Sequence, residues 1–508
     1  MAKVLPPPDW NDLFSRNSQE SPQRLLEVLS TGKPVDPRGR YLHWDEMRHR
    51  TPPDGLTLDE WWLGTALSRF ASAHFLPLKS VKGDPFRFSN IDRVQEIVHS
   101  IDKCAGGRIQ TDDAIANVQS SDRYLVSSLI EEAITSSMLE GAATTRRVAK
   151  EMLKTRRPPR THGERMVFNN FNGMLEVERM AREHRPLTPD DVLELHRVVT
   201  DGTLENDSDA GRLQQPDEER VFAVGLDDKV LHMPPPAEEL PKRLEQLCAF
   251  ANGENVEGFL HPVIRAILVH FWVGYDHPFV DGNGRTARAL FYWSMLRSGY
   301  WLAQYISISA ILRKAPGQYV KSYLKAETDN NDATYFVIYQ LEVIEQAIDS
   351  LRDYLTRKTA EIAKTKQFLQ SVVGLNNRQL SIISDALNDP YQTFTIGGQA
   401  QLHRVVYQSA RTDLLGLEEL GLFTKSKAGN KFEFHPAHDF QDRLFALIEP
   451  QEAAQANETA NAIKETPLVD VKLADVVGFP WSADQVNCWR RRNFSTLPLP
   501  VRGSSSMG

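Results

Sequence analysis

Apolar residues recur with the period of an α-helix along much of the chain. The run from Val263 to Trp272 has this period, and Pro278 cannot continue a helix, so one helix is predicted to end near His277. The next helix is predicted to begin near Gly284 and to stop at Gly299. Other amphipathic helices are predicted over residues 122–141, 187–199 and 335–355. These patterns predict a mainly α-helical protein.

A β-hairpin is predicted within this helical pattern, at about residues 220–234. Two short β-prone runs lie on either side of the turn 225–228, and three prolines follow the second run. The β-prone positions include Val221, Phe222, Val230 and Leu231. We therefore expect two short antiparallel strands at this place.

The segment 370–440 has its own order of elements. Helices are predicted over 378–387, 396–403 and 405–420, followed by a hairpin that turns at Gly429 and Asn430. This order resembles a small winged-helix domain, in which residues 409–412 would lie on the helix that enters a DNA groove. Three lysines make the hairpin basic but three acidic residues oppose them: Lys425, Lys427 and Lys431 against Asp413, Glu418 and Glu419. The charges favour a dimerisation or regulatory module, with DNA binding as the less favoured role.

Composition narrows the class of protein. At 508 residues the chain is long enough for several domains, and its net charge of −8 gives no general attraction to nucleic acid or membranes. The odd number of cysteines, 3, argues against a disulfide framework. The sequence has neither an apolar run of membrane-spanning length nor a start of the signal-peptide form. We expect a cytoplasmic protein without a membrane partner.

The stretch His277–Arg288, HPFVDGNGRTAR, concentrates residues suited to phosphate chemistry. Gly282 and Gly284 allow a turn in which several backbone N–H groups converge, and the positive end of the following helix faces the same point. Arg285 and Arg288, three positions apart, can donate to separate phosphates. The stretch therefore predicts a polyphosphate site.

The same stretch supplies a metal ligand and a base. Asp281 lies beside the predicted phosphate site, and a carboxylate in this position is the usual protein ligand of a Mg²⁺ that also binds phosphate oxygens. His277, at the helix end, can accept a proton from an attacking hydroxyl. Phe279 is better explained by packing.

HPFVDGNGRTAR resembles the signature of the Fic family, HPFx(D/E)GNGRxxR, at every defining position. The resemblance implies an all-helical core with a β-hairpin flap, and transfer of AMP from ATP to a Ser, Thr or Tyr hydroxyl of a protein. It makes His277 the general base and Asp281 the Mg²⁺ ligand. It assigns the phosphate nest to Gly282, Asn283 and Gly284, and the β- and γ-phosphates to Arg285 and Arg288. The family's phosphorylating branch has lysine in place of Gly284, so the AMP-transferring branch fits better.

A second motif resembles the family's inhibitory helix. Residues 136–141, SSMLEG, match (S/T)xxxE(G/N), with Ser136, Glu140 and Gly141 in the defining places. A carboxylate brought to Arg288 would occupy the donors that the γ-phosphate needs. The hairpin, in turn, resembles the flap that binds a target segment by strand addition. His232 within it is expected to be structural rather than a second base.

These features predict four parts: an N-terminal helical extension (1–115), a catalytic domain (116–355), the winged-helix-like domain (370–440), and a tail (450–508) whose polar composition is typical of disorder. The leading hypothesis is a protein adenylyltransferase restrained by Glu140, with ATP and a target protein as partners and a homodimer as a compatible assembly. Two alternatives stay open. The protein could remove AMP with the help of Glu140, or could act as a DNA-binding regulator whose helical core senses nucleotide.

Overall fold

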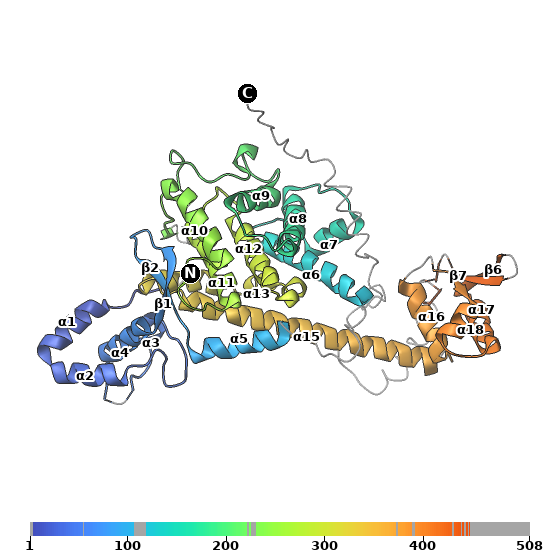
Figure 1. Ribbon diagram of the computed structural model, residues 1–508, viewed down its shortest axis with the longest axis horizontal. Coiled ribbons are helices and arrows are strands. Elements are labelled where there is room, and N and C mark those ends of the chain that lie inside the picture. Colours follow the sequence, from blue (N-terminus) through green and yellow to red (C-terminus); the bar gives the residue numbers. More distant parts are fainter. Residues whose placement is uncertain are drawn as a thin grey trace, which may run out of the picture. The chain divides into compact units, whose positions relative to one another are not determined.

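A computed structural model describes residues 4–53, 55–105, 118–220, 223–224, 230–371, 374–388, 392–428, 431–437, 439–440, 443–444 and 447. These residues are mainly helical, as predicted, with three small sheets (Figure 1). They divide into two compact units, one within 1–110 and 127–351 and the other within 111–126 and 352–508. No described helix is both long and apolar enough to cross a membrane. The predicted tail, 450–508, lies outside the described residues, and the predicted domain boundaries stay predictions.

The N-terminal part of the first unit contains helices and one sheet. Its elements are α1 (Trp10–Glu20), α2 (Pro22–Thr31), α3 (Trp44–Met47), α4 (Leu58–Ala71), β1 (Ala73–Lys79), β2 (Pro85–Ser89) and α5 (Asp92–Ala105). The antiparallel pair β1 and β2 was not predicted, since this region was expected to be a helical extension. Gly83 closes the turn with a φ of +88°, and its N–H donates to the Ser80 carbonyl at 2.9 Å. Pro77 lies within β1 and has no N–H to donate, and a proline inside such a run weakens the sequence signal for a strand.

Two adjacent helices form the centre of the first unit. They are α11 (Pro262–Asp276) and α12 (Asn283–Arg297), which pack against each other, and α8 (His162–Arg182) packs on α12 and on α9 (Pro189–Thr200) (Figure 1). Large side chains such as Trp272 and Trp293 are almost fully buried here. Because both central helices are covered on several sides, the loop between them is held by a rigid scaffold.

The remaining elements of this unit surround the central pair. They are α6 (Val118–Leu139), α7 (Arg146–Thr155), η1 (Asp207–Asp209), β3 (Ala223–Val224), β4 (Val230–His232), η2 (Ala237–Glu239), α10 (Leu240–Asn252), η3 (Trp301–Tyr305), α13 (Ile308–Leu312), α14 (Pro316–Thr328) and the start of α15 (Thr334–Ser371). The helix expected over 335–355 is thus longer than predicted. Residues 356–371 contain neither glycine nor proline, so nothing in the sequence stops it at 355.

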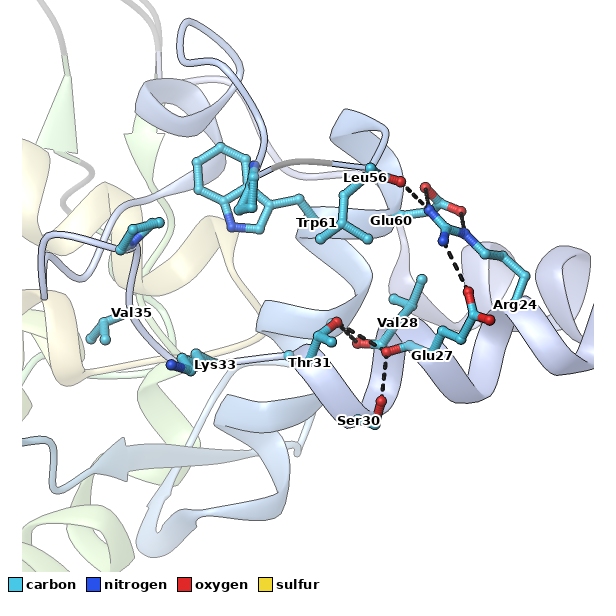
Figure 2. A pocket seen from close by; sticks show the side chains of 15 residues that line it. Arg24, Glu27, Val28, Ser30, Thr31, Lys33, Val35, Leu56, Glu60 and Trp61 are labelled. Carbon is cyan, nitrogen blue, oxygen red and sulfur yellow. Dashed lines mark hydrogen bonds and ion pairs between the residues drawn. The ribbon is translucent and has the colours of Figure 1, made fainter.

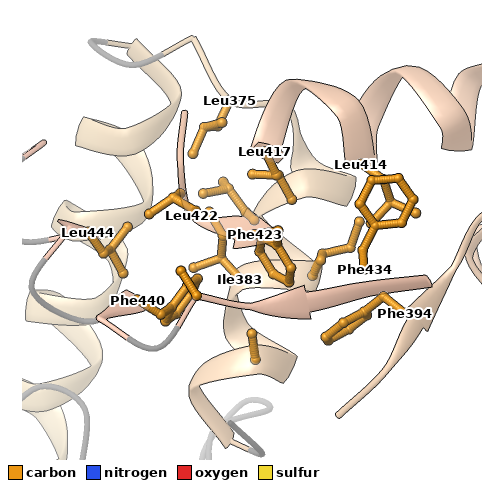
Figure 3. Packing of buried hydrophobic residues seen from close by; sticks show 14 of the residues in the cluster. Leu375, Ile383, Phe394, Leu414, Leu417, Leu422, Phe423, Phe434, Phe440 and Leu444 are labelled. Carbon is orange, nitrogen blue, oxygen red and sulfur yellow. The ribbon is translucent and has the colours of Figure 1, made fainter. Parts of the chain in front are cut away.

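Beyond the end of α15, the described residues of the second unit form three helices and a three-stranded sheet. Its elements are α16 (Asn377–Asn388), β5 (Phe394–Thr395), α17 (Ile396–Leu402), α18 (Tyr407–Glu419), β6 (Phe423–Ala428) and β7 (Lys431–Pro436), with the sheet order β5-β7-β6. Figure 3 shows its apolar core, in which Ile383, Leu414 and Leu417 from the helices gather around Phe434 of the sheet. The three helices and the hairpin strands were predicted, whereas β5 is too short to give a pattern. Gly429 and Asn430 lie outside the described residues.

Candidate functional site

The loop between α11 and α12 has two residues in left-handed backbone conformations. His277 caps α11 with a φ of +44° and donates its N–H to the Val273 carbonyl at 3.0 Å. Gly282 caps α12 with a φ of +83°. A Cβ on Gly282 would also lie 2.5 Å from Cγ2 of Thr200. Both the left-handed backbone conformation and the lack of space for a side chain therefore require glycine at this position.

The side chain of Asn283 stabilises this loop by hydrogen bonds. Its Oδ1 accepts from the backbone N–H of Phe279 at 2.9 Å, and its Nδ2 donates to the Phe279 carbonyl at 2.7 Å. The same Nδ2 lies 3.1 Å from Nδ1 of His277. The predicted role of Asn283 was in the phosphate nest, but its side chain is buried and used within the loop. Any phosphate contact from this residue must come from its backbone N–H.

The side chains of Phe279 and His196 pack against each other beneath the loop. The two rings are stacked, with centroids 3.7 Å apart and an angle of 5° between their planes, which agrees with the packing role expected for Phe279. His196 donates from Nε2 to the Asp281 carbonyl at 2.8 Å and accepts at Nδ1 from the N–H of Gly211 at 2.9 Å. Burial lowers its pKa to about 4, so the ring is neutral and holds the loop as a hydrogen-bond bridge. The sequence predicted only an amphipathic helix here, and no role was predicted for His196.

His277 is kept unprotonated by its surroundings. Burial, together with the positive charges of His232 and Arg220, lowers its pKa to about 4. His232 is itself held between the Glu327 carboxylate, 2.8 Å from Nδ1, and the Tyr275 carbonyl, 2.7 Å from Nε2. Although burial opposes it, the hydrogen bond that His232 donates to Glu327 raises the pKa of His232. His277 is therefore the neutral imidazole of the pair, and the contacts of His232 agree with a structural role.

The two arginines of the first two turns of α12 are placed differently. Arg285 is fully buried and donates to the Val199 carbonyl at 2.9 Å and to Oδ2 of Asp281 at 3.1 Å. Nη1 and Nη2 of Arg285 are thus used by the scaffold and by Asp281, whose own side chain is 56% exposed. That Arg285 binds phosphate stays a prediction. Asp281 also accepts at Oδ1 from the N–H of Gly282 at 2.6 Å, which fixes its carboxylate at the mouth of the loop.

Arg288 meets the predicted inhibitory motif. Nη2 of Arg288 lies 2.8 Å from Oε1 of Glu140, and its Nε donates to Oγ of Ser136 at 2.9 Å. Although burial opposes it, the charge of Glu140 raises the pKa of Arg288. A Cβ on Gly284 would lie 2.1 Å from the same carboxylate oxygen, so the close approach of Glu140 depends on glycine there. Gly141 ends the segment in the left-handed conformation, with a φ of +87°.

The predicted hairpin is present, but only part of it is described. Ala223 pairs with His232 and Val224 with Val230 in antiparallel register. Val221 and Phe222 lie outside the described residues, and of Val230 and Leu231 only the backbone is described. Arg220, which sequence analysis did not single out, joins the base of the hairpin to the loop. Its side chain donates to the carbonyls of Pro235 at 2.9 Å, Asp276 at 2.8 Å and His277 at 3.2 Å.

A separate cavity of about 790 Å³ lies in the N-terminal part and contains none of the predicted site residues. Figure 2 shows Arg24, Glu60 and Trp61 on its wall. Nε of Arg24 donates to Oε1 of Glu60 at 2.7 Å and Nη1 donates to Glu27 at 3.0 Å. Because these charges already pair with one another, the cavity gives no indication of a charged ligand.

The region that contains the loop is similar to known proteins. A family model described as the Fic/DOC family matches residues 186–295. The chain is 34% identical over 121 residues to "Protein adenylyltransferase Fic" of Nematostella vectensis, which is 24% of this chain and 26% of that protein. It is 31% identical over 141 residues to "Protein adenylyltransferase fic-1" of Caenorhabditis elegans, which is 28% of this chain and 25% of that protein.

The matched region thus spans about a quarter of the length of these relatives. Among solved structures, a Fic family protein from Desulfovibrio desulfuricans G20 has a TM-score of 0.44 and 17% identity, over 69% of this chain and 97% of that one. The family predicted from HPFVDGNGRTAR is confirmed. The chain contains a domain of the Fic/DOC family, and residues 186–295 match its model.

Proposed function

We propose that this protein transfers AMP from ATP to a Ser, Thr or Tyr hydroxyl of a target protein, and that Glu140 restrains the reaction. The observation that carries the proposal is the loop itself, where a neutral His277 lies next to the start of a helix whose Arg288 is paired with a carboxylate at 2.8 Å. The names of the relatives, protein adenylyltransferases, support the same reaction.

The proposed reaction needs a base for the attacking hydroxyl. His277 accepts the hydroxyl proton while the oxygen of the target attacks the α-phosphorus of ATP. The bond from the α-phosphorus to the bridging oxygen breaks, and pyrophosphate leaves with the electron pair. A pKa of about 4 keeps His277 free to accept a proton at neutral pH, and Asn283, 3.1 Å from Nδ1, fixes the ring.

Phosphate binding is assigned to the start of α12. Backbone N–H groups from Gly282 to Gly284 and the positive end of the helix suit the phosphates of ATP. Arg288 is proposed to hold the γ-phosphate with the donor that Glu140 occupies. Glu140 therefore does not fill the whole site but competes with one phosphate for Arg288. This competition would leave the α-phosphorus displaced from the attacking hydroxyl.

Asp281 is proposed to hold Mg²⁺. Its carboxylate is 56% exposed at the mouth of the loop and is fixed by Gly282 and Arg285, so one oxygen face can bind a cation that takes its other ligands from phosphates and water. A bound Mg²⁺ would offset the charge that develops on the leaving pyrophosphate. The hairpin β3–β4 is proposed to bind the target by adding a strand, and Arg220 would keep it at a fixed distance from His277.

Labelling with ATP tests the proposal. ATP labelled at the α-phosphorus is incubated with Mg²⁺ and a cell extract as the source of target, with wild type, Glu140→Gly, and Glu140→Gly combined with His277→Ala. We expect strong protein labelling with the Glu140→Gly single mutant alone, and none from ATP labelled at the γ-phosphorus. Labelling from the γ-phosphorus would indicate phosphorylation instead. Absence of α-label with every form would refute the proposal.

For the second unit we propose a winged-helix module that serves dimerisation or regulation. The order α16-β5-α17-α18-β6-β7 and the antiparallel sheet support the winged-helix assignment. Lys425 pairs with Glu418 at 3.1 Å, and Asp413 is buried against Arg378 at 2.6 Å, so part of the basic charge is already neutralised. Light scattering of the full chain tests dimerisation, and salt-dependent binding to random DNA tests the less favoured role.

A further inference from the structure

The inhibitory helix α6 is part of the core of the first unit. Its residues 129–137 are mostly buried, and Ala133, Ile134 and Ser137 have no exposed surface. Four buried polar side chains in this part of the helix, Glu132, Thr135, Ser136 and Ser137, also hydrogen-bond to neighbouring elements. Glu140, just after the end of the helix, is 28% exposed. Removing the whole helix would open the core, whereas moving the segment that carries Glu140 would not.

Glu132 fixes the position of α6 against α12. Its carboxylate is 1% exposed and accepts from the hydroxyl groups of Tyr292, Ser307 and Ser309 at 2.9, 2.8 and 2.5 Å, and from the N–H of Ser309 at 3.1 Å. Tyr292 lies one helical turn after Arg288 on α12. Glu132 therefore sets which residue of α6 faces Arg288. Sequence analysis did not single it out.

Ser136 lies one turn after Glu132 and holds Arg288 at two points. Nε of Arg288 donates to Oγ of Ser136 at 2.9 Å, and Nη2 donates to the Ser136 carbonyl at 3.2 Å. Neither contact involves Glu140. The guanidinium would thus stay oriented after the carboxylate has moved away, with the Nη2 that Glu140 now contacts available to a phosphate oxygen.

We infer that Ser136 is a positioning residue of the active enzyme and not only part of the inhibitory motif. It holds Arg288 in the orientation that binds the γ-phosphate, and α6 stays in place when inhibition is relieved. An arginine side chain loses considerable rotamer freedom when it binds a ligand. A guanidinium already held by Ser136 has lost much of this freedom before the ligand arrives, so binding costs less conformational entropy. This inference rests on the proposed binding of the γ-phosphate by Arg288.

A comparison of two neighbouring serines tests it in the Glu140→Gly background. Ser137 is equally buried, but its Oγ donates to the Met166 carbonyl at 3.1 Å and not to a group near Arg288. Ser136→Ala and Ser137→Ala each remove one buried hydroxyl from the same helix. Calorimetry then gives the affinities for ATP and ADP, which differ in the γ-phosphate.

We expect Ser136→Ala to weaken ATP binding roughly tenfold, the effect of one hydrogen bond to a charged group, with little change for ADP. The KM for ATP in AMP transfer should rise in parallel. Ser137→Ala should leave the ratio of the two affinities unchanged even if it lowers stability. If Ser136→Ala does not fold, Ser136→Cys, which keeps the size but replaces oxygen by a poor acceptor, gives the same test.

Two results would overturn the inference. One is an equal ratio of ATP to ADP affinity for both serine variants. The other is strong AMP transfer by Ser136→Ala with Glu140 intact, because Ser136 would then act only in inhibition. Failure of the Glu140→Gly protein to bind ATP at all would refute the proposed function itself, and with it the role of Ser136.

Discussion

Replacing Glu140 changes one ion pair at the end of α6. The carboxylate contacts Nη2 of Arg288 at 2.8 Å, and the two side chains are 28% and 1% exposed. Glu140→Gly removes this contact, while Glu132 and Ser136 keep the helix and Arg288 in place. The expected effect is a rise in AMP transfer, because the γ-phosphate no longer competes with a carboxylate for Arg288.

The size of the effect follows from the geometry. A hydrogen bond to a charged group contributes about 1.5–3 kcal/mol, and the partial exposure of Glu140 favours the lower half of this range. About 2 kcal/mol corresponds to a roughly 30-fold change, since each 1.4 kcal/mol is tenfold. Glu140→Gln keeps a neutral acceptor near Arg288, so we expect it to raise the rate less than Glu140→Gly does.

Initial rates of label transfer from α-labelled ATP measure this effect at an ATP concentration well below saturation. Glu131 provides the matched control, because its carboxylate is on the same helix but pairs with Arg146 at 2.6 Å. Glu131→Gln removes the same charge and should leave the rate unchanged. Competition between Glu140 and the γ-phosphate is contradicted if Glu140→Gln transfers AMP as slowly as wild type, or if Glu131→Gln raises the rate as much as Glu140→Gln does.

Two further outcomes follow from the same site. Because His277 must be unprotonated and burial lowers its pKa to about 4, the kcat/KM of the Glu140→Gly enzyme should change little between pH 7 and pH 5. An imidazole with an ordinary pKa would lose roughly 25-fold over that range, so such a loss in a pH series would contradict the assignment. Gly284→Ala places a Cβ 2.1 Å from the Glu140 carboxylate and should displace it, giving label transfer above wild type but below Glu140→Gly, because the methyl group also enters the phosphate nest. A rate at or below that of wild type would indicate that the methyl group obstructs ATP more than it displaces Glu140.

The loop was the most predictable part of the site because its structure depends on neighbours in the sequence. Pro278 ends α11, and Gly282 allows the left-handed turn into α12, so both helix boundaries could be predicted from residue types alone. The pairing of Glu140 with Arg288 was predicted from a motif resemblance. It could not have been found from spacing, since the two residues are far apart in the sequence.

The residues that support the loop were not predictable in this way. His196 contacts the Asp281 carbonyl across 85 positions, and Glu132 contacts Ser309 across 177. A histidine or glutamate on an amphipathic helix is normally a solvated residue, and only the packing of α9 and α6 against the central helices buries these two. The hairpin β1–β2 was missed for a different reason, because a proline within a run, here Pro77, argues against a strand.

Arg285 and Arg288 explain why one carboxylate can restrain the proposed reaction. Both lie within the first two turns of α12, and sequence spacing gave them equivalent roles. The Val199 carbonyl and Asp281 use the donors of Arg285, so this side chain supports the loop and neutralises the proposed Mg²⁺ ligand. Arg288 instead faces α6, where a single oxygen of Glu140 occupies Nη2. With Arg285 held by the scaffold, the proposed binding of the γ-phosphate would depend on Arg288, and control of that one guanidinium would then be sufficient to control the orientation of ATP.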